Sequence, residues 1–216
     1  MHDDPPGDDP CHAHLIVGGH AVDPDTARDV QQFRKSERQR LYAAREAWTA
    51  EARASMSRTI GEALGRGLGD LAGRRVAVYW PIRSEPDLRD WMARAHEAGA
   101  EVLLPVVVEK AAPLVFRRWA PRCRMKRGIW NIPVPADGAE AMPDLVISPL
   151  LGLDGAGYRL GNGGGYYDRT LAALPSPPEV IGVGYPDCTL ETIFPMPWDI
   201  PMGRAVLGDG DVRHFG

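Results

Sequence analysis

The chain of 216 residues has few cysteines, no long apolar run and no large excess of charge of either sign. Its three cysteines, Cys11, Cys123 and Cys188, are odd in number and widely spaced, which favours free thiols in a reducing cytoplasm over a disulfide framework. No apolar stretch approaches the roughly 20 residues that a membrane-spanning helix needs. The net charge of −4 gives no reason to expect nucleic-acid binding. We therefore expect a cytoplasmic protein with neither a membrane nor a nucleic-acid partner.

Histidine and lysine, which often serve in catalysis and in anion binding, are also scarce in the chain after residue 20. Four of the six histidines lie within the first twenty residues, and no serine or cysteine stands in a pattern typical of an activated nucleophile. A hydrolytic triad is therefore excluded. Only three lysines occur, so arginine supplies nearly all the positive charge and would make most contacts to a bound anion. The spacing of Cys11, His12 and His14 fits no closed zinc site, and we expect no metal there.

Composition divides the chain in two. Residues 1–29 are rich in Asp, Pro, Gly and His, which predicts a flexible acidic extension, and residues 30–216 are expected to form a single domain. Helical patterns and short apolar runs alternate along this domain, which predicts an α/β fold with a mainly parallel sheet. The predicted helices cover residues 29–68, with a possible break between Thr49 and Ser57, then 86–98 and 165–174. The predicted strands cover residues 75–80, 101–105, 114–119, 145–148, 180–184 and 205–207.

The most informative stretch is GYRLGNGGGYYDR, from Gly157 to Arg169. Four glycines fall within residues 161–165, and glycines allow several backbone N–H groups to converge on one anion. An apolar strand precedes this glycine loop and a helix follows it, an order that often holds phosphate. Neither the dinucleotide fingerprint G-x-G-x-x-G nor a P-loop fits. A plain turn would need only one or two glycines, so the loop predicts a nucleotide-phosphate site.

The same loop resembles a known family. Leu153-Asp154-x-x-Gly157-x-Arg159-Leu160-Gly161-x-Gly163-Gly164-Gly165-Tyr166-Tyr167-Asp168-Arg169 is similar to the signature of the 5-formyltetrahydrofolate cyclo-ligases, also called methenyltetrahydrofolate synthetases. The resemblance extends over about residues 33–207. It implies a three-layer NagB/RpiA-like fold with helices on both faces of the sheet. It also implies ATP-dependent conversion of 5-formyltetrahydrofolate to 5,10-methenyltetrahydrofolate, with Mg²⁺ as cofactor, in a monomer or weak dimer.

A stripe of arginines precedes the sheet. At about 100° per residue, Arg38 and Arg45 lie within about 40° of Arg34 on a helix, so the three share one side, which could instead be a solvated basic face. In the family the corresponding cations contact ATP, although Arg34 stands where the family has lysine. The ATP-binding residues that the resemblance implies are Arg34, Lys35, Arg38, Arg159, Leu160, Gly161, Asn162, Gly163, Gly164, Gly165, Tyr166 and Tyr167.

A second group of residues is expected to hold the folate. Glu85 matches the position at which the family binds the pterin, and a carboxylate can accept two N–H groups of an aminopyrimidine edge. Its alternative is an acid at a helix N-terminus, a role that suits Asp87 better. Trp80 could equally lie at the edge of the core. The implied substrate-binding residues are Trp80, Glu85, Trp130 and Tyr167.

Carboxylates complete the expected site. The resemblance implies Asp168 and Asp199 as Mg²⁺ ligands, with Asp154 ranked below them, and Arg38, Arg159 and Asp168 as catalytic residues. Asp168 could instead stabilise the glycine loop. Departures from the family at Arg34, Asn162, Val134 and Trp198 leave two alternatives open. One is a related ATP-dependent ligase acting on a different formyl, amide or carboxylate substrate, and the other is a non-catalytic folate- or nucleotide-binding protein.

Overall fold

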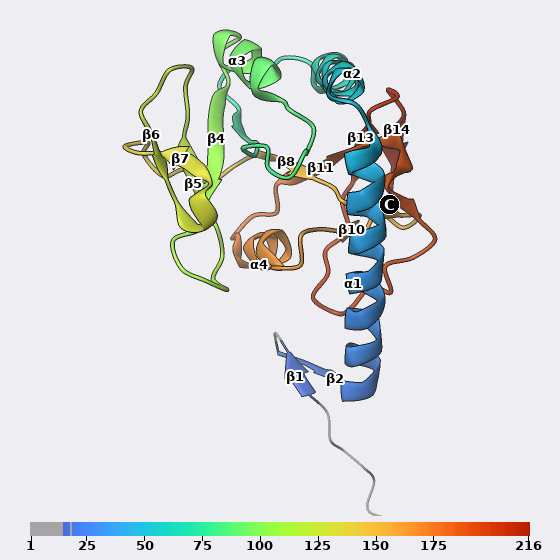
Figure 1. The fold of residues 1–216 in the computed structure, drawn as a ribbon. Coiled ribbons are helices and arrows are strands. Elements are labelled where there is room, and N and C mark those ends of the chain that lie inside the picture. Colours follow the sequence, from blue (N-terminus) through green and yellow to red (C-terminus); the bar gives the residue numbers. More distant parts are fainter. Residues whose placement is uncertain (1–14, 18) are drawn as a thin grey trace, which may run out of the picture.

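The structure, a computed structural model, describes residues 15–17 and 19–216 (Figure 1). Residues 1–14 of the predicted extension, with Cys11, His12 and His14, lie outside the described residues. Strands β1 (Leu15–Val17) and β2 (His20–Val22) form an antiparallel hairpin. Helix α1 (Pro24–Ala47) begins earlier than predicted. The reason is a capping signal: the Asp23 carboxylate accepts the Thr26 N–H at 2.9 Å, and Pro24 suits the first helical turn.

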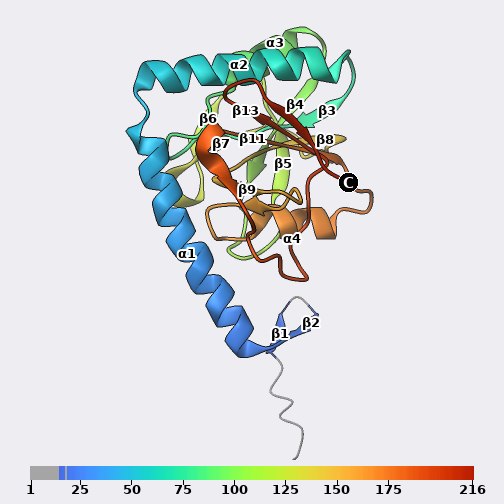
Figure 2. The same cartoon turned by 90° about the vertical axis from the view of Figure 1, so that its right-hand side faces the viewer.

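The expected break in the long helical segment is confirmed. Helix α1 ends at Ala47, and α2 (Ala50–Leu68) begins after Thr49, whose hydroxyl accepts the Ala52 N–H at 3.2 Å. Helix α1 has 24 residues, and its N-terminal half extends away from the body of the molecule (Figure 2). Its two buried residues, Leu41 and Arg45, lie in the second half. This half of α1 therefore faces the rest of the domain.

A seven-stranded sheet forms the centre, in the order β14-β13-β11-β8-β3-β4-β5. The five inner strands are parallel, and β14 and β5 join the two edges antiparallel. This arrangement confirms the mainly parallel sheet. The strands are β3 (Arg75–Ala77), β4 (Glu101–Val106), β5 (Val115–Arg118), β8 (Leu145–Pro149), β11 (Glu179–Gly184), β13 (Arg204–Leu207) and β14 (Val212–His214).

Helices cover both faces of the sheet, as a three-layer fold requires. Helices α2 and α3 (Arg89–Glu97) lie on one face, and α4 (Tyr166–Ala173) lies on the other (Figure 1). Strand β8 shows the division: Leu145 and Ile147 pack into the core beneath α2 and α3, whereas Val146 packs with Leu171 of α4. Among the described residues, none of the helices combines the length and apolar character that a membrane crossing needs.

Several short elements were not predicted. Strands β6 (Met125–Arg127) and β7 (Pro133–Pro135) form a hairpin around the short 3-10 helix η1 (Ile129–Asn131). A small second sheet contains β10 (Arg159–Leu160), β9 (Gly152–Asp154) and β12 (Thr189–Leu190), the last after the 3-10 turn η2 (Pro186–Cys188). The glycine loop therefore follows β10 of this small sheet, and two short strands that were not predicted lie between it and the central strand β8.

The region after β3 also differs from the prediction. Strand β3 ends at Ala77 and α3 begins at Arg89, so the strand is shorter and the helix later than the expected 75–80 and 86–98. The intervening chain makes a tight turn from Ile82 to Glu85, where the Glu85 N–H donates to the Ile82 carbonyl at 2.9 Å. The Tyr79 hydroxyl holds the following segment by donating to the Pro86 carbonyl at 2.6 Å. This turn brings Glu85 towards the glycine loop.

Candidate active site

The glycine loop (residues 161–165) presents a row of unpaired backbone donors at the N-terminus of α4. Gly165 occupies the N-cap position with a φ of 62° and no side chain caps the helix. No backbone N–H from residues 161–168 donates a hydrogen bond to any described residue. The first N–H groups of a helix carry a partial positive charge, and this end is open. The loop and the helix end together form a cradle for an anion.

Arg38 lies directly over this loop. Its Nε donates to the Gly161 carbonyl at 2.9 Å, and its guanidinium carbon lies 3.4 Å from where a Cβ on Gly163 would be. Gly163 has a φ of 98°, a backbone conformation that favours glycine. Neither terminal nitrogen of Arg38 makes a hydrogen bond to a described residue. Burial, followed by the nearby charge of Arg34, lowers the pKa of Arg38.

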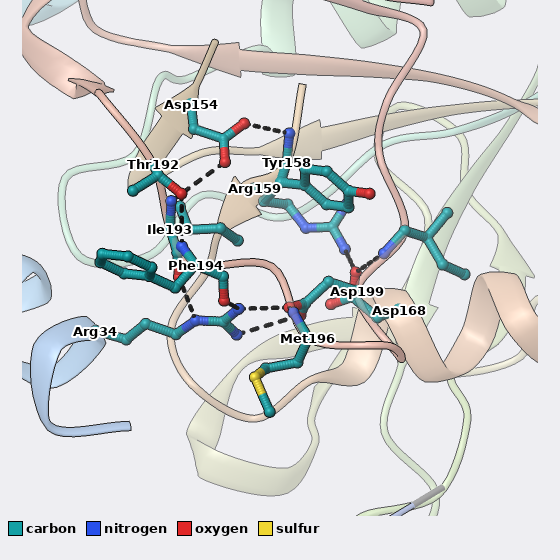
Figure 3. A network of polar contacts seen from close by, with 11 residues as sticks. Arg34, Asp154, Tyr158, Arg159, Asp168, Thr192, Ile193, Phe194, Met196 and Asp199 are labelled. Atoms are coloured by element: carbon teal, nitrogen blue, oxygen red, sulfur yellow. Dashed lines mark hydrogen bonds and ion pairs between the residues drawn. The ribbon is translucent and has the colours of Figure 1, made fainter. Parts of the chain in front are cut away.

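Arg34 differs from Arg38 because its donors are already used. Its guanidinium donates to the carbonyls of Ile193 at 2.9 Å and Phe194 at 2.8 Å, and it forms an ion pair with Asp199 (Figure 3). The two side chains are only 12% and 8% exposed. Arg34, expected to bind ATP, and Asp199, expected to bind Mg²⁺, thus bind each other in this structure.

Arg45, the third arginine of the stripe, and Lys35, which lies outside the stripe, differ in the same way. Arg45 is 3% exposed and donates to the Leu150 carbonyl at 2.5 Å, whereas Lys35 is exposed on the outer side of α1. Since Arg34, Arg38 and Arg45 all contact the domain, a solvated basic face is excluded.

Asp154 holds the chain around the ion pair. One of its carboxylate oxygens accepts the Ala156 N–H at 3.0 Å. The same oxygen accepts the Tyr158 N–H at 2.9 Å, and the other accepts the Ile193 N–H at 3.2 Å (Figure 3). Asp154 is 3% exposed, and it ties the β9–β10 hairpin to residues 191–199, which we call the strap. These contacts make Asp154 an organiser of the backbone.

Asp168 and Arg159 form a second ion pair beneath the loop. Arg159 donates to one Asp168 oxygen at 2.6 Å, and the Ile200 N–H donates to the same oxygen at 3.3 Å (Figure 3). The other Asp168 oxygen accepts no hydrogen bond from a described residue. The Arg159 side chain is 3% exposed, yet its second terminal nitrogen has no hydrogen-bond partner within residues 15–17 and 19–216. A buried donor without a partner is unusual and marks a position where a ligand atom would complete the bonding.

Tyr167 carries a second buried orphan. Its hydroxyl has no hydrogen-bond partner among the described residues, and its ring lies 5.3 Å from the Arg159 guanidinium. Burial, with a smaller contribution from the nearby Glu85 carboxylate, raises the pKa of Tyr167. The phenol therefore remains a neutral donor, close enough to Glu85 for that carboxylate to affect its pKa.

Glu85 is buried beside the loop, 77 residues away from it in sequence. Its carboxylate accepts the Ile82 N–H at 3.0 Å and the Asn162 side-chain amide at 3.3 Å. Burial raises the pKa of Glu85 above its ordinary value of 4.5. Arg83 and Ser84, in the same turn, have φ values of 47° and 56°. Two consecutive residues other than glycine in this region store strain, and such strain gathers at functional sites.

The alternative of a helix-terminal acid applies to a different residue. The Asp87 carboxylate accepts the Arg89 N–H at the start of α3 at 3.1 Å, so Asp87 has that role and Glu85 does not.

The two tryptophans are placed differently. Trp130, at the tip of the β6–β7 hairpin, is 57% exposed and meets the Tyr166 ring edge-on at 5.5 Å. Its φ of 56° is not helical and interrupts the short element η1. Trp80 is half-buried against the core, with the Arg89 guanidinium 5.4 Å from its ring. Trp130 thus presents an open aromatic face near the glycine loop, and Trp80 lies at the edge of the core.

Two residues of the site were missed from sequence. The Tyr42 hydroxyl donates to the Asn162 side chain, and Arg83 donates to the Tyr42 hydroxyl at 3.0 Å. Tyr42 lies four residues after Arg38, so it extends the same inward stripe of α1, and this spacing was the available signal. A cavity of about 520 Å³ lies elsewhere, at the start of β4, and none of these site residues lines it.

The fold and the site define an α/β protein with an anion cradle at a helix N-terminus, next to a buried carboxylate and an exposed tryptophan. A sequence profile of the 5-formyltetrahydrofolate cyclo-ligase family matches residues 30–207, and the chain belongs to this family.

Sequence relatives and solved structures agree with this assignment. The chain is 36% identical over 144 residues to a 5-formyltetrahydrofolate cyclo-ligase of Mycolicibacterium smegmatis, covering 63% of this chain and 74% of the relative. It is 34% identical over 139 residues to the enzyme of that name from Escherichia coli K12, covering 61% and 76%. The structure matches a 5,10-methenyltetrahydrofolate synthetase of Aquifex aeolicus with a TM-score of 0.72 and 27% identity, covering 84% of this chain and 92% of that one.

Proposed function

We propose that this protein catalyses the ATP-dependent conversion of 5-formyltetrahydrofolate to 5,10-methenyltetrahydrofolate, with release of ADP and phosphate. One observation carries the proposal. The N–H groups of residues 161–168 and the terminal nitrogens of Arg38 have no hydrogen-bond partner among the described residues, and the same loop contacts the buried carboxylate of Glu85 through Asn162. A triphosphate and an aminopyrimidine ring would each find the partner that its chemistry needs. Membership of the cyclo-ligase family supports the same pair of substrates.

The phosphates would lie along the glycine loop. Backbone N–H groups of the loop and of the first turn of α4 would bind their oxygens, with Arg38 above them. The orphaned nitrogen of Arg159 would bind a further oxygen from below. Arg34 would act mainly by holding the strap to α1, because its donors are used by Asp199 and two carbonyls. Lys35 is exposed and would contribute through its charge alone.

The folate would lie between Glu85 and Trp130. Each oxygen of the Glu85 carboxylate accepts one hydrogen bond and has capacity for a second, from the aminopyrimidine N–H groups. Trp130 offers its exposed face to the pterin or to the nucleotide base. The neutral Tyr167 hydroxyl, which has no partner among the described residues, would donate to the substrate. Trp80 would support the turn that carries Glu85.

The residues present also fit a magnesium ion. Asp168 has one carboxylate oxygen without a hydrogen bond from the described residues, next to the anion cradle. Mg²⁺ keeps most of its ligands as water and phosphate oxygens, so one or two carboxylates suffice. Within the described part of the chain, no group of three or more His, Cys, Asp and Glu side chains is arranged to hold a metal. Asp168 would hold the ion through this oxygen, and the ion would neutralise phosphate charge; Asp199, whose two oxygens accept hydrogen bonds from Arg34 and Met196, would have to leave Arg34 to join it.

The reaction needs positioning more than proton transfer. The formyl oxygen forms a bond to the γ-phosphorus while the bond from that phosphorus to ADP breaks. The second folate nitrogen then bonds to the formyl carbon, loses its proton and displaces phosphate. Arg38, Arg159 and the loop amides would hold the transferring phosphoryl oxygens, where they stabilise the developing charge. The pair of Tyr167 and Glu85 would orient the pterin.

An absorbance assay for the methenyl product tests the proposal. We expect product only when ATP and 5-formyltetrahydrofolate are both present, with one ADP formed per methenyl group. ATP turnover that does not depend on the folate would favour a related ligase with another substrate. Saturable binding of both ligands without product would indicate a non-catalytic binding protein. A reducing cytoplasmic location and a monomer or weak dimer are further proposals, which sedimentation and fractionation would check.

A further inference from the structure

One side chain links the phosphate loop to the proposed folate carboxylate. Asn162 belongs to the glycine loop, and its side-chain N–H donates to Glu85 at 3.3 Å. Its carbonyl oxygen accepts the hydroxyl of Tyr42, which in turn accepts a hydrogen bond from Arg83 at 3.0 Å. Tyr42 lies on α1 and Arg83 lies in the turn that carries Glu85. The bonds therefore form a closed connection between α1, the glycine loop and the Glu85 turn.

We propose that Asn162 is a positioning residue that couples the binding of the nucleotide to the binding of the folate. The proposal rests on the function given above, because it takes the glycine loop as the phosphate site and Glu85 as the pterin site. Its role is to make each substrate strengthen the binding of the other.

The loop backbone gives the physical reason. On one side of Asn162, Arg38 holds the Gly161 carbonyl at 2.9 Å, and on the other side Arg169 holds the Gly164 carbonyl at 3.4 Å. The loop between these points is free of backbone hydrogen bonds within the described residues, so an arriving phosphate would order it. Ordering the Asn162 backbone also fixes its side chain on Glu85. A coupling of this kind is reciprocal, so folate bound to Glu85 would equally favour the phosphate-binding form of the loop.

The hydrogen bond from Asn162 affects the pKa of Glu85, because this carboxylate is buried. It is 7% exposed, and the groups that face it are Arg45 from α1, Arg83 from its own turn, and the hydroxyls of Tyr79 and Tyr167. Burial raises the pKa of Glu85, whereas the Asn162 N–H and the two arginines oppose the rise. Removing the Asn162 donor would therefore raise this pKa further, and the ionised form that binds the pterin would need a higher pH.

The test compares Asn162→Ala with the parent protein. The affinity for 5-formyltetrahydrofolate is measured by calorimetry with and without a non-hydrolysable ATP analogue and Mg²⁺. In the parent we expect the analogue to tighten folate binding by about tenfold, within the usual range for coupled sites. In Asn162→Ala the ratio of the folate affinities with and without the analogue should fall to about one. In Tyr42→Phe the ratio should fall only in part, because Asn162 loses one of its two side-chain partners and is less constrained. Gln39→Ala, which removes an exposed amide of α1, is the matched control and should keep the parent ratio.

The pH profile provides a readout that a purely structural role would not change. In Asn162→Ala, the acid limb of kcat/KM for the folate should move to higher pH, while the thermal unfolding midpoint stays close to that of the parent. A parent-like ratio together with an unmoved acid limb in the folded variant would overturn the inference. Failure of the proposed function would look different, because the parent protein itself would then form no methenyl product.

Discussion

A methyl group placed on Gly164 should disable the phosphate cradle without unfolding the domain. A Cβ at this position would lie 2.7 Å from two carbon atoms of the Tyr166 ring. Ordinary carbon contacts are about 3.5–4.0 Å, so the ring or the loop must move by about 1 Å. The Tyr166 ring is not free to do so. Its hydroxyl accepts the Ala111 N–H at 3.1 Å, the Trp130 ring lies 5.5 Å away, and the Arg169 guanidinium lies 5.6 Å away.

The size of the effect follows from this restraint. Overpacking of a constrained group costs about 1–3 kcal/mol, which corresponds to a loss of about 5-fold to 160-fold if the strain falls on the ligand-binding conformation. Tyr166 is the first residue of α4, so displacing it also moves the N–H groups at the helix end. We therefore expect Gly164→Ala to lower kcat/KM for ATP by that factor.

Steady-state kinetics with ATP varied at saturating folate measures the loss, and Gly161→Ala is the control. A Cβ at Gly161 meets no atom within 4 Å, and its φ is not in the left-handed region, so this variant should stay within about threefold of the parent. Parent-like kinetics of Gly164→Ala would refute the reasoning. An equal loss in both variants would also refute it, because the loss would then come from crowding of the phosphate and not from Tyr166.

Three further predictions concern charged residues. Arg38→Ala should lower kcat/KM for ATP by about hundredfold, as for other lost anion-stabilising donors, and leave the thermal midpoint unchanged; parent-like kinetics would remove Arg38 from the site. Arg34→Ala should lower the free energy of unfolding in urea by about 3 kcal/mol, because Asp199, 8% exposed, loses its partner; a loss near zero would contradict this. Glu85→Gln should gain stability relative to the parent as pH rises. Because the pKa of Glu85 is raised in the folded state, the folded parent binds more protons than the unfolded chain above about pH 4.5, and the parent loses stability as the pH rises. Melting curves of both proteins from pH 4.5 to 8 test this, and a difference between their melting temperatures that stays constant with pH would contradict it.

The sequence predicted the layers of this fold well because their signals are local. The run Leu145-Val146-Ile147 is apolar at every position, and the structure buries it between two helical layers. The break was expected because Gly61 and Gly65 weaken the middle of the helical segment, but the structure places it at Thr49, a frequent type of N-cap residue, and α2 runs through both glycines. The loop and helix α4 were found for the same reason, since glycines and the amphipathic helix after them are neighbours in the chain.

The short elements escaped prediction because tertiary contacts create them. Strands β9 and β10 have only three and two residues, and no periodic pattern can be recognised over such lengths. Their hairpin is organised by Asp154, whose carboxylate also binds the distant Ile193 N–H. In sequence this aspartate looked like a secondary candidate for the metal. Only the three-dimensional contacts show that both of its oxygens already accept backbone N–H groups.

The arginines show most clearly what sequence cannot decide. Arg34, Arg38 and Arg45 share one side of α1, and spacing alone gives them equal claims to a phosphate. In the folded chain Arg34 is paired with Asp199, Arg45 is buried against a carbonyl, and Arg38 alone of the three leaves its terminal nitrogens without hydrogen bonds to the described residues. The pairing of Arg34 with Asp199 also affects Arg38. The positive charge of Arg34 lowers the pKa of Arg38, and the negative charge of Asp199 opposes this effect. The carboxylate that binds Arg34 thus reduces the repulsion between the two guanidinium groups and leaves Arg38 available for an incoming anion.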